Sequence, residues 1–498
     1  MDKKWWTLLA VCVGTFMLLL DVTIVVVALP DIQRALNAGF SDVQWVVDAY
    51  ALALASCLLT TGVLADRYGR RRLFGIGLVV FTLGSLLCGL AQSSVMLILS
   101  RAGQGVGGAI MFATSLALLG QSFRGRDRGV AFGLWGAITG IAVSLGPILG
   151  GVITTGISWR GIFLVNVPIG VLALAVTLWK LDESRAPHPG RLDVPGFVLL
   201  TLGLVGLVYG LIRAGETRWS DTQALVALVV GALLLVAFLV VEYLVPDPMF
   251  DLALFRKPTF VGGLCAAFAM NGSLFAMLLY LQDVLGYSAL GTGVRLLISS
   301  VAMLVAATIA GRLSEKVSAR WLIGPGLLAV GIGLLLMSGL GATSSWTELV
   351  PGFIVSGLGA GFVNPPLAST AIGVVEPARA GMASGINSTF RQVGLATSIA
   401  ALGSIFTTSL RNGLTGALAH TPLAPYTDQI INVVRQGESG GTSGIAVPPA
   451  LRPQAEVAIR LSFTGALNNL LTVTAVLALA GAVCSAVLIR DKDFAARN

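Results

Sequence analysis

Long apolar runs separated by short polar segments occupy most of the chain. A helix needs about 20 predominantly apolar residues to cross the hydrocarbon core of a bilayer. Fourteen runs of suitable length are bounded by charged residues, prolines or glycine clusters. Their limits are 5–30, 43–65, 73–92, 95–121, 130–155, 161–179, 194–213, 223–245, 258–281, 293–312, 320–340, 347–373, 381–409 and 461–489. The pattern predicts an all-α polytopic membrane protein with fourteen transmembrane helices.

An internal repeat divides these predicted helices into two sets. GVLADRYGRR at 62–71 aligns with GRLSEKVSAR at 311–320, and each follows the second helix of its set. Internal repeats are typical of transporters, in which a central site lies between two halves that move against each other. We therefore expect two six-helix bundles, 1–187 and 254–498, joined by a two-helix insert at 188–253. The polar connector at about 410–460 is expected to be a flexible extracytoplasmic loop without a fold of its own.

Composition supports membrane insertion, and the charge pattern orients the chain. Of the residues, 55% are hydrophobic and 11% are charged, whereas a soluble domain carries roughly a quarter charged residues. If the amino terminus is cytoplasmic, most of the 32 Lys and Arg residues fall in cytoplasmic segments, which places both termini inside. The net charge of +8 is then a topology signal, and we expect no nucleic-acid partner. The first apolar run lacks a small-residue cleavage site and is expected to be a retained helix.

Several functional classes lack their sequence signatures. All five cysteines lie in apolar runs without metal-ligand spacing, so we interpret them as packing residues and expect neither a metal nor a cofactor. The absence of a GxxxxGK[ST] phosphate loop argues against an ATP-driven pump. No DDxxD-like cluster supports a membrane transferase, so an enzyme is not expected. A channel would not need paired motifs in two moving halves, which favours a secondary transporter driven by an ion gradient.

Three ionisable side chains interrupt apolar helices. Asp21 lies in LLLDVTIVVVALP, Asp48 lies in QWVVDAY, and Arg101 lies in the fourth predicted helix. Counting from the helix ends places all three at a similar depth in the outer half of the membrane. A charge in hydrocarbon costs several kcal/mol unless it is paired or faces a cavity, so these residues are functional candidates. A purely structural ion pair is the alternative.

Proton exchange is the chemistry that this arrangement suggests. A low-dielectric site favours the neutral form of a carboxyl group, whereas a nearby arginine favours the ionised form. An aspartate whose distance from Arg101 and whose access to water alternate would take up a proton in one state and release it in the other. Asp21 and Asp48 both fit this description, and the residues alone do not decide between them.

Two glycine-containing segments are candidates for conformational gating. In GVLADRYGRRRLF (62–74), Gly62 and Gly69 permit close helix approach and a tight turn, and Asp66 is placed to pair with an arginine or a helix amino terminus. Arg67 and Arg70 are expected on the cytoplasmic face. A topology loop is the simpler interpretation of this segment.

The fifth predicted helix carries the second of these segments. Small residues recur at 136, 140 and 144, and Gly146, Pro147 and Gly150 follow. A spacing of four places small side chains on one face, where another helix approaches closely, and Pro147 is expected to bend the helix. Ordinary tight helix packing is the alternative to a gating role.

Polar residues in the second bundle are weaker candidates. Asn271, Gln282, Asn364 and Arg391 fall inside predicted helices and are candidates for substrate binding, with helix–helix hydrogen bonding as the alternative. The sequence Asn-Pro-Pro at 364–366 is expected to break its helix and leave free carbonyl groups, as at transporter sites.

Several of these stretches together resemble one family. The stretches are LDVTIVVVALP (20–30), GVLADRYGRRRLF (62–74), LILSRAGQGVGGA (97–109), GAITGIAVSLGPILGG (136–151), WRGIFLVNVPIG (159–170) and YLQDVLGYS (280–288). They are similar to motifs of the major facilitator superfamily and, within it, of the fourteen-helix drug:proton antiporters of the QacA/EmrB type. The likeness spans the chain, and the motifs fall on the expected helices.

The resemblance implies a function and roles for individual residues. It implies a proton-coupled exporter of amphipathic, cationic or neutral compounds, with a dedicated exporter of one metabolite, antibiotic or lipid as the alternative. Asp21 stands where the family carries its proton-linked aspartate, and Asn166 becomes a further substrate-binding candidate. Asp48 departs from the family pattern, which usually has a small polar residue at that position. The implied setting is a monomer in a bacterial cytoplasmic membrane, exchanging protons for a small-molecule substrate.

Overall fold

The structure of the protein is a computed structural model. The residues it describes are 2–38, 40–185, 193–216, 219–245, 252–270, 287, 289–314, 316–341, 344–376, 379–419, 421–427, 429–431, 448–490 and 493. Every regular element in these ranges is helical. The first half contains α1 (Lys3–Leu36), α2 (Phe40–Tyr68), α3 (Arg70–Gly89), α4 (Ser94–Ser122), α5 (Gly125–Gly156), α6 (Gly161–Leu164) and α7 (Asn166–Lys180). Next come α8 (Val194–Glu216), α9 (Thr222–Leu244), η1 (Leu252–Arg256), α10 (Pro258–Ala269), α12 (Ala289–Leu313) and α13 (Arg320–Leu336). The remainder contains η3 (Trp346–Leu349), α14 (Val350–Gly373), α15 (Ala380–Leu418), η5 (Ala424–Tyr426), η7 (Pro449–Leu451) and α17 (Arg452–Leu488).

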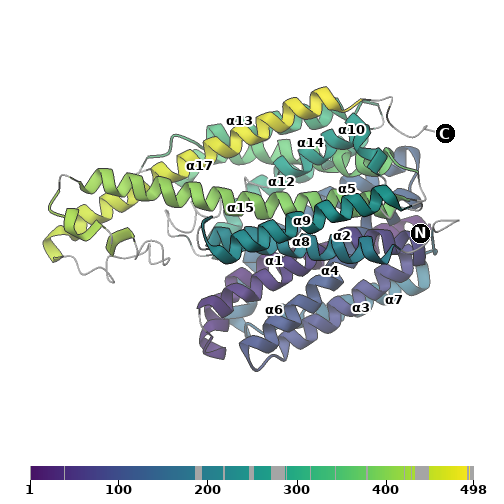
Figure 1. The fold of residues 1–498 in the computed structure, drawn as a ribbon, viewed down its shortest axis with the longest axis horizontal. Coiled ribbons are helices and arrows are strands. Elements are labelled where there is room, and N and C mark those ends of the chain that lie inside the picture. The colour runs from purple at the N-terminus through teal and green to yellow at the C-terminus, as the bar shows by residue number, and fades with distance from the viewer. Residues whose placement is uncertain are drawn as a thin grey trace.

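The helices form an elongated bundle with both ends of the chain at one end of it (Figure 1). We take α1 to α7 as one side of the bundle and α10 to α17 as the other. In the view of Figure 1, α3, α4 and α7 lie opposite α13 and α17, and α8 and α9 lie between them. A cluster of buried apolar residues joins the intervening helices to both sides, with Leu59 of α2, Leu204 of α8 and Ile386 of α15 among its members. The all-helical membrane fold is thus confirmed, whereas the boundaries expected at 187 and 253 remain predictions.

The described helices include most of the expected membrane spans. Eleven helices in the described residues are long and apolar enough to cross a bilayer, or twelve if the two parts of α5 count as one span. The short α6 and α7 together make up one of these spans, Gly161–Lys180. Two further apolar helices, α10 and α13, are shorter than a full span. The expected count of fourteen therefore stays a prediction.

Prolines shape two helices differently. The two parts of α5 are bent by 42° at a break after Val143, and Pro147 has no N–H to donate to the carbonyl group of that residue. The bend expected from Pro147 is therefore present. The break expected at 364–366 is not, because α14 runs through Pro365 and Pro366 to Gly373. Membrane helices tolerate prolines where neighbouring helices satisfy the freed backbone groups.

The expectation of an unfolded loop at 410–460 was wrong at both ends of that segment. Helix α15 continues to Leu418 and α17 begins at Arg452, so both helices project beyond the rest of the bundle (Figure 1). The projecting parts have a hydrophobic core of their own, which includes Leu410, Leu414 and Leu418. These residues recur every four positions along one helical face. The glycine-rich stretch at 437–444 lies outside the described residues.

Two matched helix crossings connect the two sides of the bundle. A Cβ atom on Gly62 of α2 would lie 2.3 Å from the carbonyl oxygen of Gly381 in α15. A Cβ atom on Gly311 of α12 would lie at the same distance, 2.3 Å, from the carbonyl oxygen of Gly129 in α5. Gly62 and Gly311 occupy equivalent positions in the sequence repeat. The repeat therefore corresponds to two equivalent contacts between backbones.

Candidate functional site

Asp21 lies on the buried face of α1. Buried residues recur along this helix at three- and four-residue intervals, including Leu18, Asp21, Val25 and Ala28. This spacing places them on one helical face. The Asp21 side chain is fully buried, so the carboxyl group depends on protein partners in place of water.

Arg101 of α4 is the charged partner of Asp21. Its Nη1 donates to Asp21 Oδ2 and forms an ion pair with it, and only 1% of the arginine is exposed. The Nε atom donates to the carbonyl oxygen of Val46 in α2 at 3.0 Å. The guanidinium also lies 4.1 Å from the centre of the Tyr50 ring, a favourable cation–π arrangement. Asp21 and Arg101, expected from the sequence at a similar depth, are therefore in contact in the structure.

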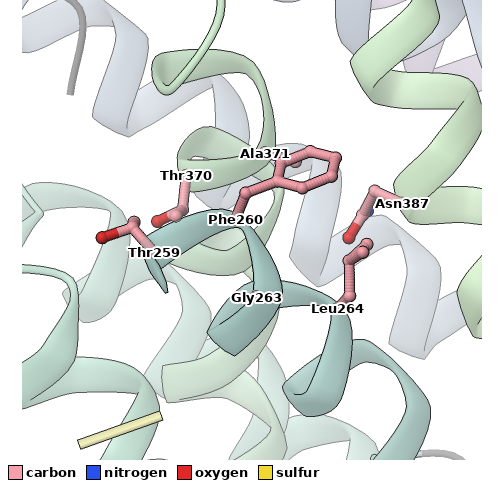
Figure 2. A pocket seen from close by; sticks show the side chains of 7 residues that line it. All are labelled: Thr259, Phe260, Gly263, Leu264, Thr370, Ala371 and Asn387. Carbon is pink, nitrogen blue, oxygen red and sulfur yellow. The ribbon is translucent and has the colours of Figure 1, made fainter. Parts of the chain in front are cut away.

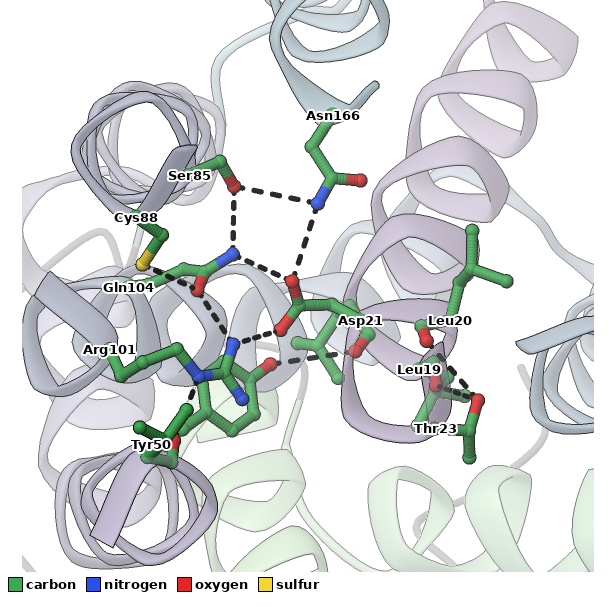
Figure 3. Close-up of polar contacts among 12 residues, drawn as sticks. Leu19, Leu20, Asp21, Thr23, Tyr50, Ser85, Cys88, Arg101, Gln104 and Asn166 are labelled. Atoms are coloured by element: carbon green, nitrogen blue, oxygen red, sulfur yellow. Dashed lines mark hydrogen bonds and ion pairs between the residues drawn. The ribbon is translucent and has the colours of Figure 1, made fainter. Parts of the chain in front are cut away.

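Three uncharged side chains complete the network around the ion pair (Figure 3). Gln104 Nε2 donates to Asp21 Oδ1 at 2.8 Å and to Ser85 Oγ at 2.7 Å. Asn166 Nδ2 donates to Asp21 Oδ1 at 3.3 Å and to Ser85 Oγ at 3.5 Å. All three side chains are buried. A buried ion pair is tolerated when further hydrogen bonds satisfy its remaining lone pairs, and these contacts supply them.

Sequence reasoning placed Asn166 with the substrate candidates and missed Gln104 and Ser85. The structure brings Asn166 to Asp21. Gln104 had one usable signal, because it lies three residues after Arg101 and residues at that spacing share a helical face. Ser85 had none, since serine is common at helix contacts in membranes.

Asp48 lies on α2, two residues before Tyr50, and is half-buried. The hydrogen bonds described for Asp21 and Arg101 do not include it. The described contacts thus join Asp21 and Arg101, and a contact between Asp48 and this pair stays a prediction. Whether Asp48 binds a substrate or a proton remains a prediction.

Asp66 joins α2 to α15 where the first helix ends and the second begins. Its two carboxylate oxygens accept hydrogen bonds from the backbone N–H groups of Gly381 and Met382, both at 2.8 Å. Arg70 Nη2 lies 2.7 Å from Asp66 Oδ1. A helix amino terminus and an arginine each favour a negative charge. The sequence offered these two contacts of Asp66 as alternatives, and the structure has both. The hydrogen bonds from Gly381 and Met382 join the two sides of the bundle, whereas the Arg70 contact lies within the first side.

The neighbouring candidates support this junction. Gly69 precedes α3 with a φ of 113°, a conformation that other residues rarely adopt. Arg70 Nη1 also donates to Gln121 Oε1 of α4 at 2.5 Å, so this arginine is held from two helices. The Arg67 guanidinium lies 5.6 Å from the centre of the Tyr68 ring.

The small residues of α5 contact several different helices. A Cβ atom on Gly146 or Gly150 would meet Thr23 or Ile24 of α1, on the same side of the bundle. Pro147 instead lies against Gly293 of α12, on the opposite side. The single interface expected for these residues is therefore divided between two contacts, because Gly146 and Gly150 share one helical face and Pro147 lies on another.

The candidates on the second side are only partly described. Asn364 is buried in α14, and Arg391 lies in α15. Asn271 and Gln282 fall outside the described residues. A cavity of about 10 Å³ lies between α10, α14 and α15, with the Thr370 and Asn387 side chains on its walls (Figure 2). This volume suits a single water molecule and is far below that of a drug-sized ligand site.

Comparison with known proteins gives a consistent family assignment. Residues 11–399 match the family model described as Major Facilitator Superfamily. The chain is 38% identical to "Multidrug resistance protein Stp" of Mycobacterium tuberculosis over 404 residues, which are 80% of this chain and 75% of the relative. It is 36% identical to the "Tetracenomycin C resistance and export protein" of Streptomyces glaucescens over 415 residues, 80% of this chain and 76% of the relative.

A solved structure supports the same fold. The human organic anion transporter MFSD10 matches with a TM-score of 0.64 and 14% sequence identity, over 96% of this chain and 100% of that one. At this level of identity the likeness concerns the fold alone. It extends over nearly the whole chain and therefore includes both sides of the bundle.

Proposed function

The chain belongs to the major facilitator superfamily, and we propose that it exports amphipathic small molecules in exchange for protons. It is a multi-pass membrane transporter of small molecules. The finer steps of the proposal concern the driving ion, the substrates and the membrane. Each is supported by a separate observation.

The buried ion pair between Asp21 and Arg101 is the observation that carries proton coupling. A charge inside a membrane protein marks a functional site unless it is purely structural. Protonation would neutralise Asp21, weaken its attraction to Arg101 and leave the arginine with its contacts to Val46 and Gln104. The energetic balance between α1 and α4 would then depend on proton occupancy. A carboxyl group that reaches water on one side in one state, and on the other side in the next, would move one proton per cycle.

The junction at Asp66 provides the conformational half of the proposal. In the described state α2 and α15 are held together at Asp66. We propose that this contact closes the substrate path at that end of the bundle. Separating them requires breaking the contacts of Asp66 with Gly381 and Met382. Substrate binding and proton release would each favour one of the two states of this junction, closed or open. Such a shift between two states is the basis of alternating access. Gly62, Gly69 and Arg70 are proposed to act as parts of the same latch.

The names of the relatives support drug or antibiotic export. One relative is named for multidrug resistance and another for tetracenomycin C resistance and export. We therefore propose amphipathic cationic or neutral compounds as substrates. A dedicated exporter of one antibiotic is the second candidate, because relatives of that kind match over a similar share of the chain. The bacterial relatives support a place in the cytoplasmic membrane.

Purified protein in liposomes tests the coupling. An imposed proton gradient should drive uphill movement of an amphipathic dye, and an uncoupler should abolish it. Asp21→Asn should insert and bind the dye but lose uphill transport, since it cannot release a proton. Dye exchange without a gradient should persist in this variant. Uphill transport by Asp21→Asn at the wild-type rate would refute the assignment of Asp21.

A further inference from the structure

In every hydrogen bond described for the Asp21 carboxyl group, a carboxyl oxygen is the acceptor. Arg101 Nη1 donates to Oδ2, and Gln104 Nε2 and Asn166 Nδ2 both donate to Oδ1. An ionised carboxylate only accepts hydrogen bonds, so this shell suits it. A protonated carboxyl group carries an O–H that must donate. The described shell therefore fits one of the two protonation states and needs at least one change to fit the other.

Gln104 is not free to make that change. Its Oε1 atom accepts hydrogen bonds from Arg101 Nη1 at 2.7 Å and from Cys88 Sγ at 3.7 Å. Turning this amide by half a turn would present N–H groups to the arginine and lose both contacts. Such a turn is energetically costly, because the Gln104 N–H groups would then face the buried Arg101 cation, which needs an acceptor.

Asn166 is free to make it. Its Oδ1 atom is buried and has no hydrogen-bond partner in the part of the chain that the structure describes. Figure 3 shows this oxygen on the side of the amide that faces away from Asp21. Half a turn about the Cβ–Cγ bond would exchange the two amide atoms, so that Oδ1 faces Asp21. Nδ2 would give up its two long hydrogen bonds to Asp21 and Ser85, but Oδ1 would lose no acceptor contact. Asn166 also begins α7, next to the one-residue break at Val165.

We propose that Asn166 is the positioning residue that adapts to the proton on Asp21, donating to the carboxylate and accepting from the protonated carboxyl group. The proposal rests on the proposed role of Asp21 in proton coupling. Ser85 supports both arrangements, because its hydroxyl group accepts from Nδ2 now and would donate to Oδ1 after the rotation. Among the described residues, the titratable or charged groups that face Asp21 are Arg101 of α4, Tyr50 of α2 and Cys88 of α3. Arg101 has no acceptor atom and the Cys88 sulfur is a weak acceptor, while the Tyr50 hydroxyl is directed at the carbonyl oxygen of Leu18.

The test compares Asn166→Leu with Asn166→Ser in proton-driven transport across a series of pH values. Leucine fills similar space but has no acceptor, whereas serine is smaller and keeps both a donor and an acceptor. In either variant the ionised Asp21 keeps two donors, Arg101 and Gln104. In Asn166→Leu the protonated Asp21 loses the acceptor proposed for its O–H, so the protonated form is destabilised more than the ionised form. Asn166→Leu should need a pH more acidic by about 0.5 to 1 unit for half-maximal transport. Asn166→Ser should keep a profile close to wild type.

Thr177→Val is the matched control, because Thr177 is a fully buried residue of α7 whose hydroxyl donates to the carbonyl oxygen of Ala173. Its pH profile should not move. An unchanged profile for Asn166→Leu would overturn the proposal, and so would equal shifts in the leucine and serine variants, which would indicate a packing role. Asp21→Asn keeps the two hypotheses apart. If that variant loses uphill transport while Asn166→Leu behaves as wild type, only the role of Asn166 fails.

Discussion

Asp21 and Arg101 are each costly to bury, and each makes the other tolerable. Removing one member of a buried ion pair costs more than removing both, because the remaining charge has no counter-ion. The network around the pair adds uncharged donors but no second charge among its described contacts. The stability of this region should therefore depend on keeping the two charges matched.

Arg101→Gln should lower the stability of the protein by about 3–5 kcal/mol, because Asp21 is left buried without its cation. Adding Asp21→Asn to the same chain should recover much of that loss. Thermal unfolding of the purified single and double variants measures both effects. If the double variant loses as much as the sum of the single variants, the two charges are not coupled.

At the residue scale, charge made the site predictable and neutral polarity did not. Asp21, Arg101 and Asp66 could be found because charged side chains in or beside apolar runs need a specific reason. Gln104 and Ser85 could not be separated from residues that only join helices. The orientation of the Asn166 amide could not be predicted either, since it depends on the positions of Asp21 and Ser85 in space.

At the scale of helices, the two glycine crossings decide how closely the sides of the bundle approach. Gly62 meets the backbone of α15 and Gly311 meets the backbone of α5. Any side chain at either position would push two helices apart, since the atoms it meets are backbone. Both crossings should therefore favour the described state over one in which these helices separate.

Gly62→Val should shift the equilibrium toward separation of α2 and α15. Overpacking costs about 1–3 kcal/mol, which corresponds to a population change of roughly fivefold to 150-fold. Distances between spin labels at the ends of α2 and α15 measure the shift. Gly103→Val is a suitable control, because a Cβ atom there would meet nothing within 4 Å.

Gly311→Val should shift the contact between α12 and α5 in the same way, as the repeat implies.

For Gly62→Val, a distance distribution that matches both wild type and the Gly103→Val control would contradict the role given to the crossing between α2 and α15.

The helices show where sequence patterns succeed and where they fail. The repeat at 62–71 and 311–320 correctly indicated equivalent places in the structure. The polar composition of 410–460 was misleading, because leucines spaced every four residues were weighed together with the glycine-rich stretch that follows. Pro365 and Pro366 were given too much weight as helix breakers, since packing in a membrane compensates for the lost hydrogen bonds.

For the whole molecule, the projecting ends of α15 and α17 form a second folded region, here called the projection, which comprises the described parts of 410–431 and 448–463. Helix α15 has 39 residues and is about 58 Å long at the usual rise of about 1.5 Å per residue, well beyond the roughly 30 Å of a hydrocarbon core. Phe406 and Phe463 meet edge to face with ring centres 4.8 Å apart where the projection begins. The projection should therefore unfold locally without the rest of the bundle.

Leu414→Ala should loosen the projection, because Leu414 is fully buried in its core and such truncations cost about 2–5 kcal/mol. Hydrogen exchange should become faster in 410–431 and 448–463 and remain unchanged in α1 to α5. Leu461→Ala, at a position that is 52% exposed, should have little effect on exchange. Faster exchange throughout the chain would show that the projection and the bundle unfold together.

The projection also matters for imaging the protein. The two sides of the bundle are related by a repeat. Electron-microscopy images of the bundle inside a detergent micelle would therefore change little if a half-turn exchanged the two sides. The projection, which leaves the bundle from one side only (Figure 1), removes that ambiguity. It gives each particle a recognisable direction and offers an antibody fragment a surface outside the micelle.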